Sequence, residues 1–453
     1  MKTSLTGKVT LPSFSLDRKL AVFPLSILIL ASLFGYSFSF PHASAAPVGN
    51  VMNFYVVVKP DFAGQGYDVF SPKTLVVQQG DQVNLTISNT GDQAFHLIIQ
   101  GEPAVTIQPG SESATGVTPV DTAVPVFTAS TPGIFNFYTT EHPEMSGQLI
   151  VLPSNWANYS PTAQTRSFTQ IALPDFAGDG YDKYFPAIMV VNQGDTVNVT
   201  VRNTDDMPHG FAIAAYGIDA AVNPGQDLPG GSIAPTDTVI QPFTASTPGI
   251  FSFLCTVYCG PGHSEMVGCL VVLPTRGSTY NPQPATMYSY LTIKPDFAGN
   301  GYDQCLPGVV FANVNDLVYI KVRNTDTATY EFTLPNFDIN NESIAPATVS
   351  TTGGLTPTDT YLTAFSPSQS GIFEFSTSNF SGTGNDQMIG YLVVLPTQNT
   401  TTPTASAVPT TFAPTSIFIY AALSAALLIV GILIGIVIVS RFSREELPEA
   451  PPR

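Results

Sequence analysis

One short motif occurs three times in the chain, and this repetition constrains the fold more than any other feature. The sequence Pro-Asp-Phe-Ala-Gly-x-Gly-Tyr-Asp begins at Pro60, Pro174 and Pro295. Each copy closes about one hundred residues later on a Leu-x-Val-Leu-Pro run, at 149–153, 270–274 and 392–396. A unit of that size is too long for a solenoid repeat and long enough to bury its own core. We therefore expect three tandem domains of one fold.

Short alternating segments inside each unit predict β-strands. The segment 76–87 places two apolar-polar alternating runs around Gly80-Asp81, and the segment 190–201 repeats the pattern. Period-two alternation with regular turn signals is typical of a β-sandwich. The prediction is an all-β chain of three tandem Greek-key sandwiches at 51–153, 165–274 and 286–396.

The two ends of the chain have the composition of targeting and membrane segments. Basic residues precede an apolar run at 20–40 and small residues follow it, which predicts a signal peptide over 1–46, with a retained anchor as the alternative. A Thr-rich stalk at 397–416 leads to 24 uncharged apolar residues at 417–440, long enough for a transmembrane helix. Arg441 and Arg444 place the tail 441–453 in the cytoplasm.

Charge and composition narrow the function classes. The formal net charge is −17 and charged residues make up only 11 % of the chain. An acidic protein is a poor partner for nucleic acid. We expect a cell-membrane protein with one membrane pass, whose bulk lies outside the cytoplasm and docks basic partners.

The most specific chemical signal lies in the second copy. Cys255, Cys259, His263 and Met266 have the spacing C-x3-C-x3-H-x2-M, and His209 lies upstream. Thiolate, thioether and imidazole ligands together favour copper over hard cations. Such a set can hold two copper ions that share both thiolates. A zinc site and a Cys255–Cys259 disulfide are the alternatives.

This ligand pattern resembles the CuA domain of haem-copper oxidase subunit II and of nitrous oxide reductase, which has a cupredoxin fold. The resemblance covers residues 165–274 closely and all three copies more loosely. It implies that Cys255 and Cys259 bridge two copper ions and that His209 and His263 each bind one. Met266 and the carbonyl oxygen of Val257 would be weaker ligands.

The other two copies have lost ligands. In the third, Thr377, Ser381 and Asn385 replace the two thiols and the loop imidazole, Tyr330 replaces His209, and Met388 remains. We expect this domain to be structural.

In the first copy, His96, His142 and Met145 suggest a possible second metal site, with one further copper ion, although Thr139 stands where a cysteine is needed. Glu141 or Glu144 would complete such a site. A degenerate site with surface histidines is the alternative.

Two further cysteines do not belong to the metal motif. Cys269 lies on the last strand of the second copy, on its outward face, and Cys305 lies near the start of the third copy. An oxidising compartment would allow a disulfide between them. Free thiols are the alternative.

The resulting hypothesis is a membrane-anchored, extracytoplasmic electron carrier with a dinuclear copper centre. It would accept electrons from a small copper protein or a cytochrome and pass them to a membrane acceptor such as a haem-copper oxidase. A role as the electron-entry subunit of that enzyme is one form of this hypothesis. No catalytic site of its own is evident. The alternatives are a copper-sequestering or copper-delivery protein and a structural surface protein. A multicopper oxidase is disfavoured because no His-x-His pair occurs among the five histidines.

Overall fold

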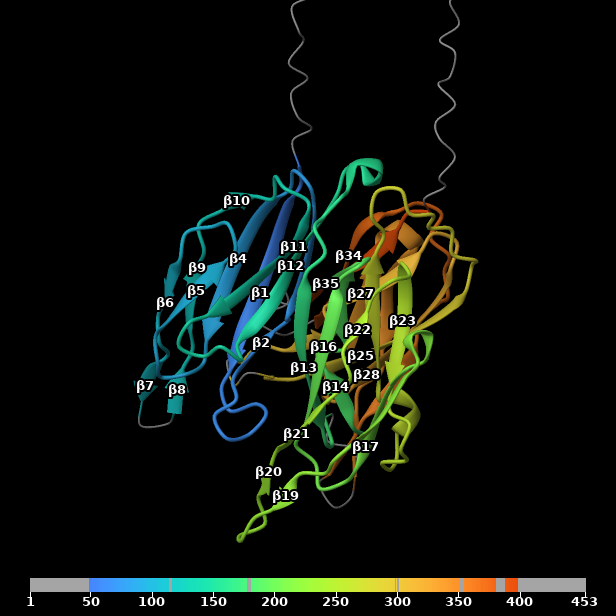
Figure 1. Ribbon diagram of the computed structural model, residues 1–453. Helices are drawn as coiled ribbons and strands as arrows, with labels where there is room; N and C mark the ends of the chain where they lie inside the picture. Colours follow the sequence, from blue (N-terminus) through green and yellow to red (C-terminus); the bar gives the residue numbers. More distant parts are fainter. Residues whose placement is uncertain are drawn as a thin grey trace, which may run out of the picture.

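The computed structural model describes residues 49–113, 116–176, 181–297, 299, 301–350, 354–379 and 388–397 (Figure 1). The predicted signal peptide, nearly all of the stalk, the membrane helix and the cytoplasmic tail lie outside these residues. Within them, no helix has both the length and the apolar character needed to cross a bilayer.

Domain 1 consists of two packed sheets and a short hairpin. The first sheet has the order β10-β4-β1-β2, with β9 also on β4, and the second has the order β3-β12-β11-β5-β6. The strands are β1 (Val51–Lys59), β2 (Val69–Ser71), β3 (Thr74–Gln78), β4 (Gln82–Asn89), β5 (Phe95–Ile99), β6 (Val105–Ile107), β7 (Ser111–Ser113), β8 (Gly116–Thr118), β9 (Val120–Ala123), β10 (Phe127–Thr128), β11 (Gly133–Thr139) and β12 (Ser146–Leu152).

Domain 2 repeats this plan. Its sheets have the orders β14-β13-β16-β21, with β22 on β16, and β15-β24-β23-β17-β18. The strands are β13 (Thr165–Leu173), β14 (Lys183–Phe185), β15 (Ile188–Asn192), β16 (Thr196–Asn203), β17 (His209–Ile213), β18 (Ile218–Val222), β19 (Gln226–Asp227), β20 (Ile233–Ala234), β21 (Thr236–Val239), β22 (Phe243–Thr244), β23 (Gly249–Leu254) and β24 (Val267–Leu273).

Domain 3 has the same two sheets, in the orders β26-β25-β28-β33 and β27-β35-β34-β29-β30. The strands are β25 (Thr286–Lys294), β26 (Gln304–Leu306), β27 (Val309–Asn313), β28 (Leu317–Asn324), β29 (Tyr330–Leu334), β30 (Ile339–Ile344), β31 (Thr348–Val349), β32 (Leu355–Thr356), β33 (Thr358–Tyr361), β34 (Gly371–Asn379) and β35 (Ile389–Leu395). Four short 3-10 helices complete the described chain: η1 (Trp156–Asn158), η2 (Ala214–Tyr216), η3 (His263–Glu265) and η4 (Pro335–Phe337).

The predicted all-β architecture is confirmed, and its cause is visible strand by strand. Along β16 every second side chain, beginning with Val197, is buried, which is the alternation the sequence shows. Strands that neighbour one another in a sheet are mostly not consecutive in the chain, so the chain crosses repeatedly between the sheets. In each domain the first strand pairs in parallel with the fourth, as β1 does with β4.

The three domains share one apolar interface. The second sheet of each domain is covered on both faces, because its outer face packs against the other two domains. Val76, Val190 and Phe311, which occupy aligned positions on β3, β15 and β27, are all buried in this single cluster. Since aligned positions of all three copies meet there, the repeat organises the assembly as well as each domain (Figure 1).

The repeated motif explains a second contact between domains. Phe62, Phe176 and Phe297 occupy the same place in its three copies. Their rings meet, with centroids 5.6 Å apart for Phe62–Phe297 and 6.4 Å apart for Phe176–Phe297. The repeated phenylalanine of the motif therefore forms a contact between domains.

The tyrosine of the same motif contacts the next domain in each case. The Arg202 guanidinium of domain 2 lies over the ring of Tyr67, 4.8 Å from its centroid. Arg323 of domain 3 covers the ring of Tyr181 at 3.8 Å. Tyr302 of domain 3 meets a tyrosine of domain 1 edge to face, at 6.1 Å.

Removing one ring of the phenylalanine cluster should destabilise the whole assembly. We expect Phe297→Ala to cost about 3–5 kcal/mol, because it deletes a buried aromatic side chain at a contact between domains. Thermal unfolding followed by circular dichroism measures this loss. Val239→Ala, at an exposed position, should change the stability by less than about 0.5 kcal/mol. Equal midpoints for the two variants would contradict the assembly role.

Candidate metal centre

The donors of domain 2 lie where three strands end. His209 begins β17, Cys255 directly follows β23, and Met266 directly precedes β24. The backbone N–H of Cys255 donates to the carbonyl of Met266 at 3.0 Å and closes the loop between these two strands. The loop donors are therefore anchored at both ends to the rigid second sheet.

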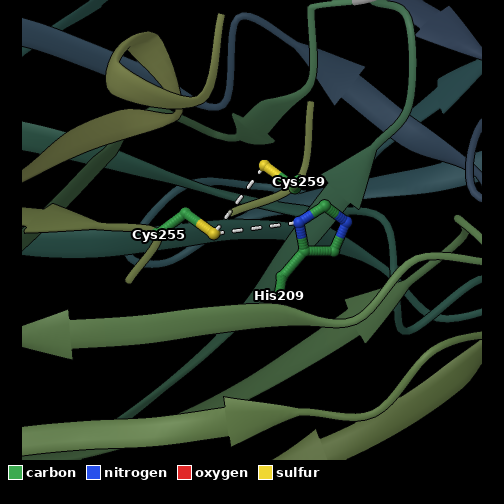
Figure 2. A group of neighbouring side chains, drawn as sticks. All are labelled: His209, Cys255 and Cys259. Carbon is green, nitrogen blue, oxygen red and sulfur yellow. Dashed lines mark hydrogen bonds between the residues drawn. The ribbon is translucent and has the colours of Figure 1, made fainter. Parts of the chain in front are cut away.

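The two thiols face each other, with His209 beside Cys255 (Figure 2). A second imidazole, that of His263, lies beside Cys259. The sulfur atoms of Cys255 and Cys259 are 3.9 Å apart. Nδ1 of His209 lies 3.8 Å from the Cys255 sulfur, and Nδ1 of His263 lies 3.5 Å from the Cys259 sulfur. The Met266 sulfur is 3.9 Å from the Cys259 sulfur.

The carbonyl oxygen of Val257 belongs to the same cluster, because it accepts a hydrogen bond of 3.0 Å from the Cys255 thiol. All six donors predicted from the sequence thus belong to one cluster of neighbouring atoms. Cys255 and Cys259 are 3 % and 6 % exposed and His209 is fully buried, so water is largely excluded.

The donors do not converge on a single point. His209, Cys255 and Cys259 offer atoms that all lie within 4.8 Å of one another, and this group does not include His263, which lies beside Cys259. A single zinc ion, with bonds of about 2.0–2.3 Å, needs all four ligand atoms within about 4.6 Å of one another. The four donors as placed therefore do not form one closed tetrahedral site.

The two thiols differ in their readiness to ionise. Burial alone would raise the pKa of Cys255, but His209 and the backbone N–H of Gly210 outweigh it, so this pKa lies below its ordinary value. Burial and the negative charge of Cys255 and Asp182 raise the pKa of Cys259 well above its ordinary value. A cation bound between the sulfurs would supply the charge that the second thiolate needs.

Two carboxylates that the sequence did not single out orient His209. Asp205 Oδ2 lies 3.3 Å from Nε2 of His209, and Asp182 joins the same group of atoms. This Nε2 is buried and lacks a well-aligned hydrogen bond, so the contact is electrostatic. Although burial opposes a charge on the ring, Asp205 and Cys255 together raise the pKa of His209 to about 9. A carboxylate behind an imidazole makes the opposite ring nitrogen a stronger metal ligand.

Gly210 permits the close approach of β17 to the loop. A Cβ atom at this position would lie 2.2 Å from the Thr256 hydroxyl and 2.8 Å from the Thr256 backbone nitrogen. The aligned residues in domains 1 and 3 are His96 and Glu331, which carry side chains. The glycine that follows His209 is thus a sequence signal for the site that could have been noticed.

Domain 3 has a different residue in each described ligand position except the methionine. Tyr330 occupies the place of His209, and its hydroxyl lies 2.6 Å from a carboxylate oxygen of both Asp303 and Asp326, which share its one proton. These are the counterparts of Asp182 and Asp205. Thr377 is buried in the place of Cys255, while Ser381 and Asn385 lie outside the described residues.

The possible second metal site in domain 1 is not assembled as predicted. The pairing of β5 with β11 places Thr139 opposite Leu97, as β29 and β34 place Thr377 opposite Phe332. Phe95 therefore stands where His209 stands in domain 2, and His96 points to the other face, with 58 % of its side chain exposed. A shift of one residue reverses the face of a strand. The prediction that His96 takes the place of His209 is therefore wrong.

A different group gathers in domain 1. Nδ1 of His142 lies 3.1 Å from Glu144 and 3.4 Å from Asp68, while His96 pairs with Glu141 at 2.6 Å. Met145 is buried in the domain core. One imidazole with two carboxylates lacks the thiolate and the second imidazole on which the copper prediction depended.

The two remaining cysteines are free thiols, as are Cys255 and Cys259. The disulfide predicted between Cys269 and Cys305 is not formed. Cys305 points into the core of domain 3, where burial raises the pKa of its thiol to about 12. Cys269 lies instead on the outer face of β24, against the interface between the domains.

Comparison with known proteins gives a partial match. No protein-family model matches the chain. Nitrous-oxide reductase from Stutzerimonas stutzeri is 34 % identical over 87 residues, which are 18 % of this chain and 12 % of that protein. The enzyme from Ralstonia nicotianae is 34 % identical over 85 residues, with the same two shares. The chain thus spans 12 % of the length of these relatives.

Among solved structures, a copper-containing nitrite reductase from Thermus scotoductus overlaps 76 % of this chain and 99 % of its own, with 14 % identity and a TM-score of 0.20. A multicopper oxidase from Pseudomonas thermotolerans overlaps 77 % and 100 %, with 10 % identity and a TM-score of 0.21. TM-scores of this size carry no argument about this chain. The partial sequence match and the paired-sheet architecture support a cupredoxin-like fold.

The free state of the thiols can be tested directly. Alkylation of metal-stripped, denatured protein with iodoacetamide, without reductant, should modify all four cysteines, because the structure contains no bond between sulfurs. Peptide mass spectrometry measures each adduct. A cross-linked peptide that joins Cys269 to Cys305 would instead restore the disulfide predicted from the sequence.

Proposed function

We propose that this protein is an extracytoplasmic electron carrier, anchored in the membrane by its C-terminal segment, with a pair of copper ions in domain 2. The observation that carries the proposal is the paired donor set. Two thiols 3.9 Å apart each have their own imidazole, with Nδ1 of His209 at 3.8 Å from the Cys255 sulfur and Nδ1 of His263 at 3.5 Å from the Cys259 sulfur.

The donor chemistry favours copper over other metals. Two thiols, two imidazoles and a thioether form a soft set, and hard cations prefer oxygen ligands. The 34 % identity with nitrous-oxide reductases supports this assignment, although it extends over only 18 % of the chain.

The bound copper pair would supply reversible one-electron oxidation and reduction. The chain contributes rigidity to this chemistry. The rings of Phe211 and Phe253, with centroids 5.3 Å apart, pack behind the site, and Tyr184 contacts both. The Tyr184 hydroxyl also donates to the Gly210 carbonyl. Donors fixed in this way move little when the charge of the site changes, and small rearrangement favours fast electron transfer.

One side of the site faces solvent. His263 is partly exposed, and the ring of Tyr258, itself 74 % exposed, lies 5.8 Å from it. We place the entry or exit of electrons here. The net charge of −17 favours a basic donor, such as a small copper protein or a cytochrome, and a haem-copper oxidase is the proposed acceptor in the membrane.

A copper-storage or copper-delivery protein is the competing function. A carrier must cycle reversibly between oxidation states with its metal retained. Voltammetry of the copper-loaded protein that shows metal release on each reduction would favour storage.

Electron paramagnetic resonance of the purified full-length protein tests the copper pair. We expect two copper ions per chain and a signal in which one unpaired electron is shared by both. Cys259→Ser should abolish this signal because it removes a shared ligand, and His209→Ala should disturb it. His96→Ala is the matched control and should leave it unchanged. One zinc ion per chain, or no bound metal, would end the proposal.

The carboxylate behind His209 should matter for affinity. We expect Asp205→Asn to weaken copper binding by about 10- to 100-fold, the usual cost of losing a partner that orients a metal ligand. Competition with a copper chelator measures the change. Asp219→Asn, whose carboxylate contacts Thr256 on the exposed side, serves as the control. Equal affinities for the two variants would show that Asp205 does not orient the imidazole.

A further inference from the structure

The loop that carries the copper ligands is held from outside by domain 3, the domain that has lost its own ligands. The contact between this loop and domain 3 is made by Glu265, which lies in η3 between His263 and Met266. Its carboxylate contacts Lys321 of domain 3 at 2.5 Å, Lys183 of its own domain at 3.3 Å and Arg323 of domain 3 at 3.9 Å.

The ion pairs continue within domain 3. Asp359 accepts from Lys321 at 2.9 Å and from the Arg323 guanidinium at 2.7 and 2.9 Å. Lys183, Glu265, Lys321 and Arg323 each have less than 15 % of the side chain exposed. Desolvated and multiply bonded charges are costly to separate, so this network differs from an ordinary surface ion pair.

A second contact reaches the loop through an aromatic ring. Gly262, adjacent to His263, has a φ of +76°, and a Cβ atom there would lie 2.2 Å from the ring of Tyr181. The Arg323 guanidinium lies 3.8 Å from the centroid of the same ring. The loop, the tyrosine and the domain 3 arginine are therefore in continuous contact.

The interface between domains 1 and 2 provides an internal comparison. There Arg202 pairs with Asp237 and covers Tyr67, in the positions of Arg323, Asp359 and Tyr181. The lysines, however, have no counterpart, because the aligned residues are Val69 and Thr200. A cleft of about 970 Å³ lies at that interface, lined by Tyr67, Glu144 and Thr200 among others.

We propose that domain 3 is the positioning partner of the metal loop: Lys321 and Arg323, held by Asp359, fix Glu265 and Tyr181 and thereby hold His263 and Met266 in place. The effect of this restraint on bound copper rests on the proposed function. The restraint of the loop by domain 3 does not depend on metal binding. Domain 3, which lacks metal ligands of its own, would then stabilise the metal loop of domain 2 through specific contacts.

The test measures opening of the loop in metal-free, full-length protein. The rate at which a maleimide labels buried Cys259 follows the equilibrium population of the open loop. We expect Arg323→Met and Glu265→Gln each to accelerate this labelling by roughly 5- to 30-fold, which corresponds to the loss of one or two kcal/mol. Lys321→Met should act likewise, and Lys321→Arg should restore slow labelling.

Two controls separate loop opening from general unfolding. Arg202→Met removes the aligned arginine at the other interface and should leave Cys259 labelling unchanged. Cys305, buried in domain 3, reports opening of that whole domain and should not be labelled faster in Glu265→Gln. Unchanged Cys259 labelling in both Arg323→Met and Glu265→Gln would overturn the proposal, as would equal acceleration at Cys259 and Cys305 in Glu265→Gln.

Copper-loaded protein gives a second readout. The reduction potential and the copper hyperfine splitting should shift in Arg323→Met and Glu265→Gln and stay at their original values in Arg202→Met. If the original protein takes up no copper, the proposed function fails, yet the labelling of metal-free protein still decides whether domain 3 holds the loop.

Discussion

The apolar contact between the outer sheet faces of the three domains is the constraint on which the other features depend. Strands β3, β15 and β27 present valines to one shared cluster, and the strands beside them contribute Ile150, Val271 and Val393. An isolated domain would expose this apolar face to water, which is unfavourable in proportion to its area. The three copies are therefore stable together, and their contact fixes which loop of one domain meets which sheet of the next.

That geometry places the metal loop between its own rigid strands and a neighbouring sheet. Strands β17, β23 and β24 define the inner side of the site, where Gly210 allows the chain segments to touch. Asp205 on that side restrains His209. On the outer side, the loop has a charged contact at Glu265 and an aromatic contact at Gly262. A donor set restrained on both sides resists the change in bond lengths that accompanies a change in charge.

Sequence patterns sufficed for features that depend on local order along the chain. The repeat predicted three sandwiches, and the spacing of the donors identified the loop. A short loop anchored to strands at both ends holds its side chains at positions that depend on their spacing in the sequence. Predictions failed where the face of a strand had to be known. His96 and Phe95 differ by one position, and only the pairing of β5 with β11 shows which of them points inward. The disulfide predicted between Cys269 and Cys305 is absent for a similar reason, since the strand of Cys305 turns the thiol into the core of its own domain.

The contacts of the repeated motif were beyond sequence reasoning because they join domains. A motif present three times suggests a structural role, yet the chain alone does not show that Phe62 meets Phe297 or that Tyr181 supports the metal loop. The same arrangement explains how one copy can lose its ligands without becoming dispensable. In domain 3 a tyrosine hydroxyl satisfies the two carboxylates that face an imidazole in domain 2, so the core remains paired without a metal. Strand β28, in its first sheet, meanwhile carries the lysine and arginine that reach the neighbouring loop. Within a threefold assembly of this kind, ligands and the groups that restrain them can reside in different domains, because the ligand loop of domain 2 is held by the domain that follows it.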